Sequence, residues 1–304
     1  MVENIEQPAS QQVSANGLQI TYDSFGDHAD PAMILIMGLG TQMIHWSDQF
    51  CQLLVRKKFR VIRFDNRDIG KSSWLRNSPV PSIWDFIGNS LFSKKVRAPY
   101  LLDDMADDTL ALMDALKIDK AHLVGVSMGG MIAQCIALKS PTRVITLTSI
   151  MSTTGNRSLP RPKLKISAKL LKSVTREIEA YVAQSLDIWR MLHGEHFPFD
   201  QESVEKTIRN SWQRGFNPAG VGRQLGAIID SPDRTRALQK LHIPSLVIHG
   251  DIDPLVPVEC GIATADAIPG ARLKILTGMG HTLPAQLWPQ IVDDIVELTQ
   301  GNLS

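Results

Sequence analysis

The sequence predicts an α/β protein whose mostly parallel sheet of eight strands is flanked by helices. Short apolar runs alternate along the chain with segments in which apolar residues recur at helical spacing. The run at residues 32–37 is apolar at every position, which is typical of a strand that helices cover on both faces. The strand–helix–strand–helix order is itself typical of a doubly wound sheet.

The predicted elements follow one another in the order that such a sheet requires. Residues 13–25 predict a hairpin, because alternating apolar residues follow the turn pair Asn16-Gly17. The six other strands are predicted at the apolar runs 32–37, 59–64, 122–126, 144–150, 245–248 and 273–276. Helices are predicted between and after them at about 101–116, 131–138, 261–267 and 289–299.

Residues 153–235 depart from this alternation. They hold helical patterns at about 163–174, 176–189, 202–212 and 221–229, and no clear strand pattern. We therefore expect a helical cap at 153–235, inserted into a sheet domain formed by residues 1–152 and 236–304.

Length and composition fit one large domain with such an insertion. The 304 residues are 43% hydrophobic and 21% charged, which is ordinary for a soluble globular enzyme. A net charge of +1 gives no general attraction to polyanions, so neither nucleic acid nor stable membrane association is expected. The three cysteines are far apart and lack metal-ligand spacing, so we predict buried free thiols and no metal site.

The N-terminal residues also bear on location. They carry acids where a signal peptide carries bases, and no apolar core follows them. No apolar run approaches the roughly 20 residues that span a bilayer. A cytoplasmic protein is the expectation.

The strongest functional signal is the segment Gly125-Val-Ser127-Met-Gly129-Gly130. A predicted strand ends just before it and a predicted helix follows, so the serine lies on a sharp turn. A serine hydroxyl is a weak nucleophile that needs an exposed position and a base within reach. The helix start adds free N–H groups and the positive end of the helix dipole. The alternative is a glycine-rich helix start with an inert serine.

This segment resembles the nucleophile elbow of the α/β-hydrolase fold superfamily. The resemblance covers residues 13–150 and 236–300 well and the cap only loosely. It implies an α/β-hydrolase fold with Ser127 as the nucleophile. It also implies an acid and then a histidine further along the chain.

An acid and a histidine follow in that order. Asp253 lies in Gly-Asp-Ile-Asp-Pro, which resembles the acid loop of the family, and is expected to orient the base. Asp251 is the other candidate for this acid. If it is not the acid, it caps or solvates the loop. His281 follows Gly-Met-Gly after the last predicted strand, and the resemblance implies that it is the base. The glycines would let its ring swing toward Ser127.

The segment Ile-Met-Gly-Leu-Gly at 36–40 resembles the loop that supplies an oxyanion-hole donor in this family. Acyl-transfer intermediates carry negative charge on the former carbonyl oxygen, and a donor aimed there is worth about 2.7–4 kcal/mol. We expect the backbone N–H groups of Leu39 and Met128 to be these donors. Many family members have histidine where this chain has Met37, a difference that leaves backbone donors unaffected. The alternative is a glycine turn without function.

Large side chains are the candidates for the substrate pocket. Trp84 lies in the long connection 71–100, and Trp189, Met191 and Trp212 lie in the predicted cap. Long connections in compact domains are often functional, so we expect these side chains to wall an apolar acyl or alcohol pocket. The alternative is that they pack the cap onto the core.

Two charged features are interpreted structurally. Arg67 and Asp68 lie in another stretch similar to the family, and we expect them to pair and brace the loops beneath the site. Basic residues between 157 and 172 would suit a lipid surface, but a solvated helix face is the favoured interpretation.

These segments together resemble carboxylesterases and methylesterases of the aclacinomycin type. The resemblance implies hydrolysis of a small to medium carboxylic ester through an acyl-enzyme, without metal or organic cofactor, by a monomer or homodimer. Carbon–carbon bond hydrolases and cofactor-free perhydrolases also use serine and stay open. Epoxide hydrolases and haloalkane dehalogenases have an aspartate at the elbow, which Ser127 argues against. A non-catalytic protein that binds small ligands is the alternative of another class.

Overall fold

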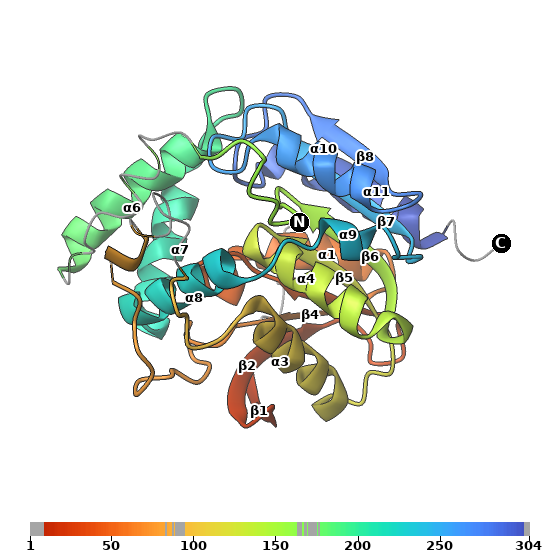
Figure 1. Cartoon of the computed structure of the whole chain (residues 1–304), viewed down its shortest axis with the longest axis horizontal. Coiled ribbons are helices and arrows are strands. Elements are labelled where there is room, and N and C mark those ends of the chain that lie inside the picture. Colours follow the sequence, from red (N-terminus) through yellow and green to blue (C-terminus); the bar gives the residue numbers. More distant parts are fainter. Residues whose placement is uncertain are drawn as a thin grey trace, which may run out of the picture.

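A single mostly parallel sheet organises the computed structural model, which describes residues 9–82, 84–86, 88, 95–162, 166, 169, 175 and 177–300. The eight strands lie in the order β1-β2-β4-β3-β5-β6-β7-β8 (Figure 1). They are β1 (Gln11–Ala15), β2 (Leu18–Phe25), β3 (Ala32–Ile36), β4 (Arg60–Phe64), β5 (Ala121–Val126), β6 (Val144–Ile150), β7 (Ser245–Gly250) and β8 (Arg272–Leu276). Each strand overlaps a predicted one, which confirms the predicted fold class.

Strand direction decides where a site can form. β2 runs antiparallel to both of its neighbours, β1 and β4, and every other neighbouring pair is parallel. The carboxyl ends of β3, β5, β6, β7 and β8 therefore lie at one edge of the sheet. In open α/β sheets, ligands bind in the crevice outside this edge.

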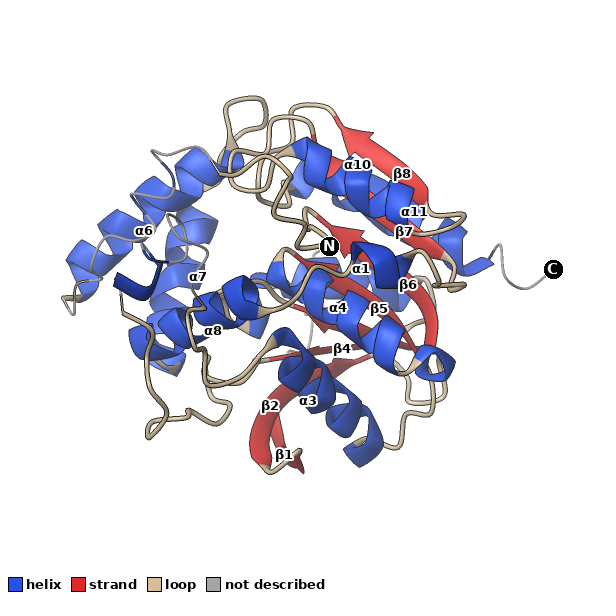
Figure 2. Ribbon diagram, in the orientation of Figure 1, coloured by secondary structure: helices blue, strands red, loops and turns tan. Residues whose placement is uncertain are grey.

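Helices cover both faces of the sheet (Figure 2). The helices on one face are α3 (Leu102–Ala115), α4 (Met128–Lys139) and α10 (Val258–Ala267), and those on the other are α1 (Asp48–Arg56) and α11 (Trp288–Gln300). Successive residues of β3 alternate between the two resulting cores. Ile34 and Ile36 pack under α3 and α4, and Met33 and Leu35 pack under α1 and α11. This two-sided burial explains why β3 is apolar at every position.

Within the described residues, four helices lie between β6 and β7 in the sequence. They are α6 (Ile178–His193), α7 (Gln201–Arg214), α8 (Pro218–Asp230) and the short α9 (Thr235–Leu238), which leads back to the sheet. Figure 1 shows α6, α7 and α8 grouped beside the sheet, at the left of the view. The helix predicted at 163–174 falls almost wholly outside the described residues. The division into a cap at 153–235 and a core stays a prediction.

Several helices differ from the sequence expectation, and α4 and α1 illustrate why. Helix α4 begins at Met128, three residues earlier than predicted, because the turn at Ser127 passes directly into it. Helix α1 was not predicted. Its buried residues, Phe50, Cys51 and Leu54, span little more than one helical turn. That stretch is too short for a helical spacing of apolar residues to be recognised in the sequence. The Ser47 hydroxyl caps it by accepting the Phe50 N–H.

The remaining expectations about composition concern cysteines and membrane spans. Cys51, Cys135 and Cys260 are free and buried, as predicted. In the described part of the chain, no helix combines the length and apolar character that crossing a membrane requires.

Candidate active site

The turn at Ser127 joins β5 to α4 in a strained backbone conformation. Its φ of 56° and ψ of −119° lie where few side chains other than glycine are found. The Ser127 N–H donates to the Ile150 carbonyl on β6 (2.9 Å), which ties the turn to the neighbouring strand. A Cβ at Gly125 would lie 2.2 Å from the Gly129 carbonyl oxygen, and one at Gly129 would lie 2.0 Å from the Ile36 carbonyl oxygen. Both glycines are therefore required by close packing around the turn.

His281 and Asp253 meet at this turn. His281 Nε2 lies 3.0 Å from Ser127 Oγ, and His281 Nδ1 lies 2.6 Å from Asp253 Oδ2. The side chains of His281 and Asp253 are buried, whereas Ser127 is partly exposed. The structure thus brings the three predicted side chains into one chain of hydrogen bonds that ends at an accessible hydroxyl.

The loop after β7 separates the two candidate acids. Asp253 Oδ1 accepts the backbone N–H groups of Leu255 (2.9 Å) and Val256 (2.8 Å), which leaves Oδ2 directed at His281. Asp251 instead accepts the N–H of Gly278 (2.7 Å). Asp253 therefore contacts the imidazole, and Asp251 fastens one loop to another.

The segment before His281 is held by the end of α6. The His281 N–H donates to the Leu192 carbonyl (2.7 Å). A Cβ at Gly280 would lie 2.2 Å from that same carbonyl oxygen, and one at Gly278 would lie 2.2 Å from the ring of His196. These glycines therefore allow α6 and its following loop to approach closely, a role other than the ring movement expected from the sequence.

The loop after β3 lies against the serine. A Cβ at Gly38 would lie 3.2 Å from Ser127 Cβ, so this loop passes directly beside the nucleophile candidate. Met128 begins α4, so its N–H has no partner within the helix. Within the residues that the structure describes, no hydrogen bond from the Leu39 or Met128 N–H is found. Among those residues both N–H groups are therefore without a partner, one next to Ser127 in the chain and one in the loop that passes beside it, so their role in an oxyanion hole stays a prediction.

Gln224 of α8 anchors this loop and was missed by the sequence analysis. Its Oε1 accepts the Gly40 N–H (2.9 Å), and its Nε2 donates to the Arg67 carbonyl (2.9 Å). The side chain is fully buried. A partner 184 residues away from Gly40 carries no local signal, so only the tertiary structure shows this contact.

The predicted pocket side chains lie in different surroundings. Trp189 stacks on His45 with ring centroids 5.0 Å apart, and burial lowers the pKa of His45 to about 4. Trp212 stacks on Phe216 instead, at 4.1 Å, in an aromatic cluster between α6 and α7. Met191 is half-buried. Trp84 leaves 76% of its surface exposed, which does not match the pocket wall expected of it.

Arg67 and Asp68 do not pair with each other, contrary to the sequence expectation. Arg67 pairs with Asp108 of α3 (2.6 Å), and Asp68 pairs with Arg223 of α8 (2.7 Å). Both partners are distant in sequence, so adjacency suggested the wrong pair. Each residue still braces the site region, one toward the sheet domain and one toward α8.

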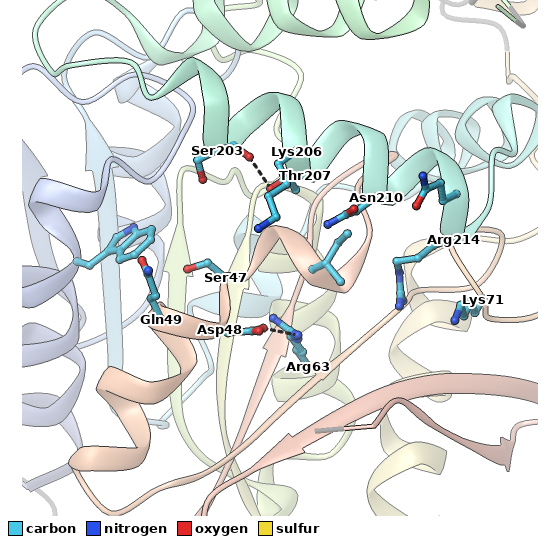
Figure 3. A pocket seen from close by; sticks show the side chains of 13 residues that line it. Ser47, Asp48, Gln49, Arg63, Lys71, Ser203, Lys206, Thr207, Asn210 and Arg214 are labelled. Atoms are coloured by element: carbon cyan, nitrogen blue, oxygen red, sulfur yellow. Dashed lines mark hydrogen bonds and ion pairs between the residues drawn. The ribbon is translucent and has the colours of Figure 1, made fainter. Parts of the chain in front are cut away.

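A polar cavity of about 610 Å³ lies between α1 and α7 (Figure 3). Arg63, Lys71, Lys206 and Arg214 line it, and Figure 3 shows Asp48 turned toward Arg63. Its lining includes neither Ser127 nor His281, so the cavity is separate from the hydrogen-bonded residues Ser127, His281 and Asp253.

Among the residues that the structure describes, no group of three or more acidic, histidine or cysteine side chains could hold a metal ion.

Comparison with known proteins identifies the family. The sequence profile of the α/β hydrolase fold matches residues 31–285. Rhodomycin D methylesterase DauP of Streptomyces sp. is 29% identical over 296 residues, covering 90% of this chain and 93% of its own. The 3-oxoadipate enol-lactonase 2 of Acinetobacter baylyi is 26% identical, covering 87% of each chain. The crystal structure of a hydrolase from Pseudomonas aeruginosa is 25% identical, covers 99% of this chain and 100% of its own, and has a TM-score of 0.70. The chain belongs to the α/β hydrolase fold family.

Proposed function

We propose that this protein is a serine hydrolase that cleaves carboxylic esters of small to medium size through an acyl-enzyme. The observation that carries the proposal is the chain of hydrogen bonds from Asp253 through His281 to Ser127, with donor–acceptor distances of 2.6 and 3.0 Å. These distances fit a base that can accept the serine proton. The similar methylesterase and enol-lactonase support an ester as the substrate class.

The first half of the reaction forms the acyl-enzyme. Ser127 Oγ attacks the ester carbonyl carbon while His281 Nε2 takes its proton. Asp253 accepts the Nδ1–H, which holds the ring in the productive tautomer and stabilises the imidazolium. The N–H groups of Leu39 and Met128 hold the oxyanion. The intermediate then collapses, and the alcohol leaves with the proton from His281.

The second half uses the same groups with water as the nucleophile. His281 takes a proton from water, the hydroxide adds to the acyl carbon, and Ser127 leaves with the returned proton. The strained backbone at Ser127 supports this role, because such strain persists only where the surroundings impose it and clusters at active sites.

Intact mass after treatment with a fluorophosphonate tests the nucleophile. We expect one adduct on the unmodified protein, one on the control variant Ser140→Ala at the far end of α4, and none on Ser127→Ala. An adduct that survives Ser127→Ala, or an unmodified protein that forms none, contradicts the proposal. A panel of p-nitrophenyl esters then tests the ester class, and turnover of none of them would contradict it.

A further inference from the structure

His249 is a fully buried side chain on β7, directly beneath the loop that carries Asp253. Its Nε2 lies 2.8 Å from the Val256 carbonyl oxygen and 3.6 Å from Asp253 Oδ2. Both neighbours are acceptors, so Nε2 must carry a proton. The mechanism described above makes no use of this residue.

The other ring nitrogen has no partner. His249 Nδ1 is buried and makes no hydrogen bond to any described residue. It faces Gly261 of α10, where an added Cβ would lie only 2.4 Å from it. The ionisable groups around the ring are Asp253, His281 and Glu259, and burial is the largest influence, lowering the pKa of His249. The ring is therefore a neutral donor with a fixed direction.

The Val256 peptide links this donor to the acid. Its carbonyl accepts from His249 and its N–H donates to Asp253 Oδ1. His249 therefore holds closed the turn that supplies a hydrogen bond to one carboxylate oxygen. The same Nε2–H edge faces the other oxygen, Oδ2, which accepts from His281. Losing this support would let the carboxylate rotate away from the imidazole.

We propose that His249 is a positioning residue that fixes the Asp253 carboxylate, and through it the ring of His281. The inference rests on the proposed function, because it concerns the reactivity of Ser127. The competing explanation is that His249 only fills space between β7 and α10. The two explanations differ in whether the N–H matters or only the ring volume.

Two substitutions separate the N–H from the ring volume. His249→Phe keeps a planar ring and removes the donor, and we expect it to lower kcat and the rate of fluorophosphonate labelling by roughly 10- to 100-fold, with KM changed less than about twofold. His249→Gln offers an amide N–H to Val256 and should recover most of that loss.

The matched control is His122→Phe. His122 is also buried, lies on β5, and contacts Thr146 Oγ1 through Nδ1 at 2.9 Å. We expect this control to lower the melting temperature without changing the labelling rate. If His249→Phe labels as fast as the unmodified protein, or if Gln recovers nothing, the inference is overturned. If the unmodified protein does not label at all, the proposed function fails instead.

A measurement on the unmodified protein covers the case in which the variants do not fold. The ¹⁵N spectrum of histidine-labelled protein should show His249 as the neutral tautomer protonated at Nε2. A ring that is charged, or protonated at Nδ1, near neutral pH would overturn the inference.

Discussion

Ser127 shows at the scale of one residue how the fold positions the proposed nucleophile. The side chain is ordinary, but its backbone has φ of 56°, a conformation that costs of order 1–3 kcal/mol. Close packing of Gly125 against Gly129, and of Gly129 against β3, leaves no relaxed alternative. The result is a hydroxyl held within 3.0 Å of an imidazole.

Substituting in turn the two aspartates after β7, Asp251 and Asp253, tests which of them orients His281. We expect Asp253→Asn to lower kcat by about 10⁴-fold, because an amide can stabilise the wrong tautomer and cannot stabilise the imidazolium. Asp251→Asn is the control, since its amide oxygen can still accept the Gly278 N–H. Steady-state kinetics on one ester gives both values. Comparable losses in the two variants would contradict the assignment of Asp253.

Local signals made this part of the site predictable from the sequence. The serine turn and the two loops after β7 and β8 each carry a short pattern of glycine beside a reactive side chain. The contacts that hold those loops could not be predicted in the same way. Gln224 reaches Gly40, and Arg223 reaches Asp68, from positions about 150 or more residues away along the chain. Such partners depend on how α8 packs, which no local pattern encodes.

Helix α6 connects two sides of the site at the scale of one element. The Leu192 carbonyl accepts the His281 N–H, and Trp189, one turn earlier, stacks on His45. Residues three apart lie on the same face of a helix. This face of α6 therefore contacts the segment that follows β3, through His45, as well as His281. The predicted pocket role therefore has more support for Trp189 than for Trp212 or Trp84.

Alanine at Trp189 tests that role. We expect Trp189→Ala to shift preference toward longer acyl chains, because removing the indole opens space beside the site. In a p-nitrophenyl ester series, the kcat/KM ratio of an eight-carbon to a two-carbon acyl group should rise by roughly 10-fold, about the effect of one or two methylene contacts. Trp212→Ala is the matched control, and should lower stability without changing the ratio, by less than the about 3–5 kcal/mol of a fully buried tryptophan because Trp212 is half-buried.

Two outcomes of this experiment would contradict the pocket role of Trp189. If Trp189→Ala only lowers stability and leaves the ratio unchanged, the tryptophan only packs α6 onto the rest of the protein. A changed ratio for Trp212→Ala would place the pocket between α6 and α7 instead.

Buried ionisable groups give the whole molecule a dependence on pH. Burial lowers the pKa of both His45 and His122 to about 4, well below the value of 6.5 in an unfolded chain. Below pH 6.5 the unfolded chain therefore binds protons that the folded protein does not. The contribution of these neutral rings to the free energy of unfolding is at its full value above pH 6.5, and it decreases as the pH falls toward 4.

Denaturant unfolding of His122→Gln at pH 7 and pH 5 tests this dependence. Each neutral ring should account for a loss of about 2 kcal/mol between the two pH values, since one pKa unit corresponds to about 1.4 kcal/mol. The decrease in the free energy of unfolding should therefore be about 2 kcal/mol smaller in His122→Gln than in the unmodified protein. His242→Gln, at an exposed position, should leave the decrease unchanged. Equal decreases in all three proteins would mean that His122 is solvated or protonated in the fold, and that burial in β5 does not set its charge.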